Sequence, residues 1–134
     1  MSLSANIEGN DVSLNELTSE IIDCAMTVHS ELGPGLLEKV YETCLVQELK
    51  SKGLKVKSQV PLPVIYKGKP LEAVYRVDLM VEEKIILEVK TVESIQPIHK
   101  AQLLTYLKLS NNCLGLLLNF NSVHLKDSIK RVIN

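Results

Sequence analysis

The sequence predicts an α/β fold, an α+β sandwich in which helices flank a mixed sheet. Amphipathic helical stretches fill the first third of the chain, strand-like segments fill the middle, and one further helix precedes a last apolar strand. The 134 residues, of which 46% are hydrophobic, suffice for one sizeable core. We therefore expect a single domain over residues 1–134, built in the order helix, three strands, helix, strand.

Two helices are expected before the first strand. Ser13 and Glu16 have the spacing of a capping box, so the first helix is expected over residues 13–32. The Gly-Pro-Gly sequence at 33–35 ends it, and a second apolar stripe predicts a helix over residues 36–52.

The first strand is expected over residues 55–66. It contains Pro61 and Pro63, and proline has no N–H to donate to a sheet ladder. We therefore expect this strand at an edge of the sheet.

The next two strands carry charged side chains in an apolar setting. Strand side chains alternate between faces, so odd-numbered residues form an apolar face and even-numbered ones carry the charges. A tight turn at residues 82–84 then sets Asp78 opposite Glu88 and Arg76 opposite Lys90. Half-buried charges need a partner or a function. We interpret the odd face as core and the even face as a site.

Two opposed carboxylates are suited to a divalent cation. Like charges directly opposite each other destabilise a strand pair, and a cation removes that repulsion. Mg²⁺ and Mn²⁺ bind oxygen ligands, usually one or two carboxylates together with a substrate phosphate. The structural alternative is a salt-bridge checkerboard in a non-enzymatic partner subunit, formed by Arg76, Asp78, Glu88 and Lys90.

The last third of the chain predicts a helix over residues 97–109 and a strand over 114–120. The strand is almost entirely apolar, as expected of one covered on both faces. Residues 125–133 fit either a helix or a final strand. Gln102 and Tyr106 share one face of the helix, which is either solvated or turned toward a site.

The charged strand pair resembles the metal site of the PD-(D/E)XK nuclease superfamily. That site combines an Asp ending one strand with Glu-x-Lys on the next, and Asp78, Glu88 and Lys90 match it. The residue before the Asp is Val77 here, where the superfamily name has Pro.

Two further motifs are similar to those of particular members. Residues 35–41 read Gly-x-x-Glu-x-x-Tyr with Glu38 in the middle, which resembles the motif of the GxxExxY protein family. Gln102 and Tyr106 match the Gln-x-x-x-Tyr motif of RecB-type nucleases.

The resemblance implies a restriction-endonuclease-like core and metal-dependent hydrolysis of phosphodiester bonds, with DNA favoured over RNA. It implies that Asp78, Glu88 and the Val89 carbonyl hold Mg²⁺ or Mn²⁺, assisted by Glu38 as a third carboxylate, while Lys90 orients the attacking water. The residues expected to contact or position the substrate are Gln102, Tyr106 and Arg76.

The charge of the chain is unevenly distributed. The net charge of −1 is low for a nucleic-acid-binding protein, but residues 1–48 sum to −8 and residues 49–134 to +7. Residues 50–69 hold six lysines and no acid. They form either an edge strand protected from aggregation or a phosphate-facing groove wall. The low basicity leaves a second function open, a catalytically idle nucleic-acid or protein-binding module that retains the nuclease fold.

Other classes of protein fit the sequence poorly. No apolar run reaches the roughly 20 residues of a membrane span, and the N-terminus lacks a signal-peptide pattern, so we expect a soluble, cytoplasmic protein. Cys24, Cys44 and Cys113 lack metal-site spacing and are expected to be buried free thiols. A homodimer is compatible with cleavage of both strands.

Overall fold

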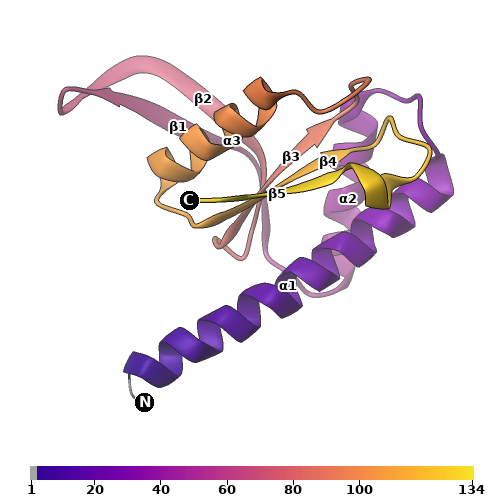
Figure 1. Cartoon of the computed structure of the whole chain (residues 1–134), viewed down its shortest axis with the longest axis horizontal. Coiled ribbons are helices and arrows are strands. Elements are labelled where there is room, and N and C mark those ends of the chain that lie inside the picture. The colour runs from indigo at the N-terminus through magenta and orange to yellow at the C-terminus, as the bar shows by residue number, and fades with distance from the viewer. Residues whose placement is uncertain (1–2) are drawn as a thin grey trace.

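The computed structural model describes the backbone of residues 3–134 and the side chains of residues 14–134 except Ala73. The two helices expected before the first strand are present, the second of them begins the predicted helix-strand-strand-strand-helix-strand order, and one more strand follows it (Figure 1). In chain order the elements are α1 (Leu3–Leu32), α2 (Glu38–Ser51), β1 (Val56–Tyr66), β2 (Lys69–Val81), β3 (Ile85–Lys90), α3 (Pro97–Ser110), β4 (Leu114–Asn119), the 3₁₀ helix η1 (Leu125–Ser128) and β5 (Ile129–Ile133).

The five strands form one mixed sheet in the order β1-β2-β3-β4-β5. Only β3 and β4 pair in parallel, because α3 carries the chain back across the sheet between them. The other neighbours are antiparallel. The predicted α/β sandwich is confirmed, and β1 lies at an edge as its prolines indicated.

Helices cover both faces of the sheet. On one face α1 and α2 pack against the odd-numbered residues of β3 and against Leu79 and Val81 at the end of β2. On the other face α3 packs against Met80 and Ile86, and Val77, which was expected on the odd face, belongs to this second cluster. The interpretation of the even face as a site without core was therefore wrong, because α3 buries its apolar members. Strand β4 is buried along its whole length, as predicted.

Three local expectations need correction. The first helix does not begin at Ser13, since α1 continues back to Leu3 and no proline interrupts residues 3–12. Residues 125–133 are divided between a short 3₁₀ helix and a strand, because Leu125 is buried while β5 pairs with β4. All three cysteines are free thiols, but Cys113 is exposed.

None of the described helices has the length and apolar character that crossing a membrane requires.

Candidate active site

Tyr41 fixes the start of α2. Its hydroxyl donates to the Gly33 carbonyl at 2.5 Å and accepts from the Leu36 N–H at 3.1 Å, so it bridges the turn between α1 and α2. Its ring stacks on Phe120 with centroids 4.7 Å apart. These contacts anchor the turn to the core and fix the position of Glu38, an exposed residue in the first turn of α2.

Asp78 and Glu88 lie where β2 and β3 separate. The β2–β3 ladder has the predicted register and runs as far as the pair Leu79/Leu87. Beyond it the side chains replace the ladder. The Asp78 N–H donates to Oε2 of Glu88 at 2.8 Å, and the Val89 N–H donates to Oδ2 of Asp78 at 2.8 Å. The two carboxylates are thereby held between the strands.

The second oxygen of each carboxylate is available to a ligand. No described residue donates a hydrogen bond to Oδ1 of Asp78 or Oε1 of Glu88. The Val89 N–H points toward β2, and the carbonyl of a strand residue points to the same side as its N–H, so this carbonyl faces the same gap. Three hard oxygen donors therefore converge here, and this donor set fits Mg²⁺ or Mn²⁺.

Burial makes the charge of this pair costly. It raises the pKa of Glu88 to about 8, and the neighbouring charge of Asp78 contributes to that rise. Burial also raises the pKa of Asp78; the Val89 N–H opposes this rise, while the charges of Glu42 and Glu38 add to it. Without a cation the raised pKa of Glu88 favours its protonated form at neutral pH, and a divalent cation would favour the ionised form of both carboxyls.

The salt-bridge checkerboard, the structural alternative to a metal site, is absent from the described residues. None of the ion pairs among the described residues involves Arg76, Asp78, Glu88 or Lys90. Lys90 is half-buried and still lowers the pKa of both carboxyls through its charge.

Arg76 does not lie opposite Lys90 as predicted. The β2–β3 ladder has ended before this point, and Arg76 pairs instead with Pro61 on β1. Its Nη1 donates to the Gln59 carbonyl at 3.3 Å, and its side chain is exposed.

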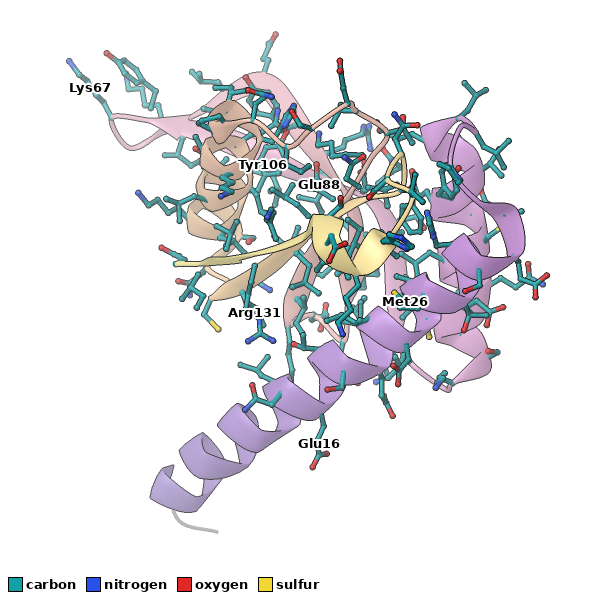
Figure 2. The ribbon with its side chains drawn as sticks, turned by 45° about the vertical axis from the view of Figure 1, so that its right-hand side comes forward. Glu16, Met26, Lys67, Glu88, Tyr106 and Arg131 are labelled. Carbon is teal, nitrogen blue, oxygen red and sulfur yellow. The ribbon has the colours of Figure 1, made fainter. Side chains whose placement is uncertain are left out.

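Tyr106 of α3 lies next to the carboxylate pair, whereas Gln102 is exposed one turn earlier. Burial raises the pKa of Tyr106, and the charge of Glu88 is the next cause. Its ring packs against Tyr75 with centroids 5.9 Å apart. Figure 2 shows Glu88 and Tyr106 near each other within the body of the molecule.

Glu42 is a carboxylate near the site that the sequence reasoning missed. It is 6% exposed, and its Oε1 accepts a hydrogen bond from Gln59 Nε2 at 2.9 Å. It follows Glu38 by one helical turn. The signal in the sequence that could have identified Glu42 is its place next to Tyr41, beside the apolar stripe of this helix.

Asn119 was also missed, although it is a polar residue within the apolar run 114–120. Its side-chain amide donates to the Val92 carbonyl at 2.9 Å and accepts from the Val92 N–H at 3.1 Å. These two hydrogen bonds connect the segment after β3 to the end of β4. Asn119 is the residue of β4 that pairs with Lys90 of β3.

The candidate metal site contains two carboxylates, those of Asp78 and Glu88, rather than three. Within residues 14–134 no three His, Cys, Asp or Glu side chains are grouped closely enough to hold a metal ion. Any contribution of Glu38 to a bound cation is therefore expected to pass through water rather than through direct ligation.

Comparison with known proteins agrees with this fold. The family model of the PD-(D/E)XK nuclease superfamily matches residues 15–132. The chain belongs to this superfamily, whose members are generally nucleases that use divalent metals such as Mg²⁺.

One solved structure, the crystal structure of SSO0001, shares the fold with a TM-score of 0.55 and 23% sequence identity. The match covers 72% of this chain and 50% of SSO0001, so the chain spans half the length of that protein. No curated protein matches.

Proposed function

We propose that this protein is a Mg²⁺- or Mn²⁺-dependent nuclease that hydrolyses phosphodiester bonds of DNA. The observation that carries the proposal is the pair Asp78/Glu88. The buried carboxylate of Glu88 and the half-buried one of Asp78 each accept one backbone hydrogen bond, and each keeps its second oxygen without a donor among the described residues. Placing two carboxylates together in such a setting is unfavourable in a purely structural role, because neither has a cationic partner in the described part of the chain.

Each residue of the pair has a role in this proposal. Asp78, Glu88 and the Val89 carbonyl hold the ion, which when bound polarises a phosphoryl oxygen and lowers the pKa of a water. Lys90, on the same strand as Glu88, orients that water and stabilises the charge that develops in the transition state. The Asn119 amide, by fixing the segment after β3, limits the movement of Lys90.

The surrounding residues position the substrate. Tyr41 fixes the turn before α2, and Glu38 from that helix orients a water of the metal site; both belong to the GxxExxY-type motif at residues 35–41. Tyr106 forms one wall of the site, and the exposed side chains of Gln102 and Arg76 contact the phosphate backbone.

A nuclease assay with isosteric variants tests the proposal. Glu88→Gln and Asp78→Asn can still accept the two backbone N–H groups, so the strands should stay in place while cation binding is lost. We expect cleavage of duplex DNA in Mn²⁺ to fall by at least about 100-fold in each, and likewise in Lys90→Met. Circular dichroism should show unchanged folding.

Matched control variants distinguish the effect of a change in the site from the effect of the same chemical change elsewhere on the surface. Glu93→Gln and Lys84→Met make the same chemical changes at exposed positions and should retain activity. Full activity of Glu88→Gln would contradict the proposed site. A wild type that binds nucleic acid in Mn²⁺ but cleaves neither DNA nor RNA would instead favour the idle binding module.

A further inference from the structure

The β1–β2 hairpin ends in an arm, which we define as residues 65–75. A bulge between Pro63 and Ile65 lies near its base, where Val74 pairs with Pro63, and the pair Tyr66/Lys69 closes its tip. The two turn residues, Lys67 and Gly68, have φ of 50° and 79°, as a two-residue hairpin turn requires. Figure 1 shows the arm extending past α3, and Figure 2 places Lys67 at its tip, far from Glu88.

The surface of the arm combines apolar and basic side chains. Five large hydrophobic residues are 44–61% exposed on it: Ile65, Tyr66, Leu71, Val74 and Tyr75. Lys67 and Lys69 with the adjacent Arg76 outnumber the one acid, Glu72, giving a local charge of +2 on a chain of net charge −1. An apolar patch of this kind is typical of an interaction surface, and its charge favours an anionic partner.

Next to the arm, the edge strand β1 is protected against strand addition, because Pro61 and Pro63 remove two N–H donors from it. The tip and the faces of the arm are the elements that the proposal uses.

We propose that the arm enters the major groove of double-stranded DNA beside the cleavage site; this inference rests on the proposed nuclease function. A two-stranded ribbon fits the roughly 12 Å wide major groove of B-DNA. The deep, narrow major groove of an RNA duplex does not admit it. Lys67 and Lys69 contact phosphates on entry, while the apolar side chains contact thymine methyl groups.

The arm is continuous with the site. Tyr75, at the base of the arm, packs against Tyr106, and Arg76 is two residues from Asp78 along β2. Lys69 precedes Asp78 by nine residues, so the tip lies at most about 30 Å from the site. At 3.4 Å per base pair, the arm contacts DNA within about nine base pairs of the cut.

The structure divides the six lysines of residues 50–69 into two groups. Lys67 and Lys69 lie at the tip, whereas Lys57 lies at the opposite end of β1 and forms an ion pair with Glu83 at 2.6 Å. The basic stretch is therefore no continuous wall. Lys50 and Lys52, at the far end of α2 from Glu38, are exposed and provide a matched control.

Binding measured in EDTA tests the arm independently of catalysis. Fluorescence anisotropy would compare a DNA duplex of about 20 base pairs, long enough to reach about nine on one side of a site, with an RNA duplex and a single strand of the same sequence. Wild type should prefer the DNA duplex. Lys67→Gln/Lys69→Gln should lose that preference and flatten the slope of log K against log salt by about 1.8, at about 0.9 per phosphate contact. Lys50→Gln/Lys52→Gln should keep both.

Three results would overturn the inference. One is an unchanged salt slope in the tip variant. Another is an equal loss of affinity for all three nucleic acids. The third is a dimer that dissociates when Ile65 or Leu71 is changed to Ser, which would assign the arm to a second copy of the chain. Because EDTA removes metal ions from this assay, it measures binding by the arm and not cleavage. A failure of the arm proposal can therefore be distinguished from a failure of the proposed nuclease function.

Discussion

Asp78 and Glu88 occupy the place of the next rung in the β2–β3 ladder. The backbone N–H of Asp78 donates to the Glu88 carboxylate, and the Asp78 carboxylate accepts from the residue after Glu88. The two strands are therefore joined through side chains at the point where they separate. This arrangement holds both carboxylates in place through backbone N–H groups. Burial raises the pKa of both carboxyls, and the two backbone N–H groups oppose that rise without cancelling it.

The first prediction concerns the pH dependence of stability. Folding raises the pKa of Glu88 from its ordinary value of 4.5 to about 8, so the native state binds this proton more tightly than the unfolded chain does. The stabilisation that comes from binding this proton is complete below about pH 4.5 and is lost as pH rises toward about 8. The free energy of unfolding should fall over this range by on the order of a few kcal/mol. Glu88→Gln cannot ionise. In EDTA its free energy of unfolding should exceed that of wild type increasingly between about pH 5 and about pH 8.5.

Urea denaturation at about pH 5 and at about pH 8.5 measures this difference in the free energy of unfolding. Exposed Glu93→Gln should follow wild type. If the free energies of unfolding of wild type and Glu88→Gln change with pH in parallel, the native protein stabilises the ionised Glu88 carboxylate better than the structure indicates.

The second prediction is a reversal of sign at Asp78. In EDTA above about pH 8, where the Glu88 carboxyl with its pKa of about 8 is ionised, Asp78→Asn keeps an acceptor for the Val89 N–H and removes repulsion from Glu88, so stability should be unchanged or raised by up to about 1 kcal/mol. With Mg²⁺ at a hundredfold excess over its Kd, wild type gains about 2.7 kcal/mol and the variant loses most of that gain.

Thermal melts of both proteins in EDTA and in Mg²⁺ provide the measurement, with exposed Asp23→Asn as control. A wild-type midpoint that ignores Mg²⁺ and Mn²⁺, together with equal destabilisation of Asp78→Asn in both buffers, would remove the metal site.

The site was predictable from the sequence where it depends on local pattern. The alternation of residues 73–90 and the short turn at 82–84 determine the register, and the register brings Asp78 to Glu88. Arg76 was misplaced because nothing local shows that the two carboxylates end the ladder. Glu42 was missed because its partner, Gln59, lies on β1 rather than on α2 and adopts a φ of 52°, a backbone conformation that the sequence does not predict.

The third prediction concerns Tyr41 as a positioning residue. Tyr41→Phe keeps the stacking on Phe120 but leaves the Leu36 N–H and Gly33 carbonyl without the hydroxyl. We expect a loss of about 1–2 kcal/mol in the free energy of unfolding. Cleavage should fall at temperatures where the variant is still folded, because the turn that places Glu38 is loosened.

The stability control is Tyr66→Phe at the exposed tip of the hairpin. If Tyr41→Phe lowers stability while the activity of the folded protein stays unchanged, then Tyr41 supports the core and has no role in placing Glu38.

The fourth prediction concerns Glu42. Its charge contributes to the raised pKa of Asp78, so it adds negative potential where the cation binds. Glu42→Gln retains an acceptor for Gln59 and removes the charge, together with the ion pair between Glu42 and the exposed Lys39 at 3.8 Å. Calorimetric titration should show Mg²⁺ affinity reduced by up to about tenfold, or about 1.4 kcal/mol, which is less than the loss in Asp78→Asn. Glu48→Gln, later on the same helix, should bind Mg²⁺ as wild type does. An affinity equal to wild type in Glu42→Gln would restrict the electrostatic site to Asp78 and Glu88, and a loss as complete as that of Asp78→Asn would make Glu42 a direct ligand.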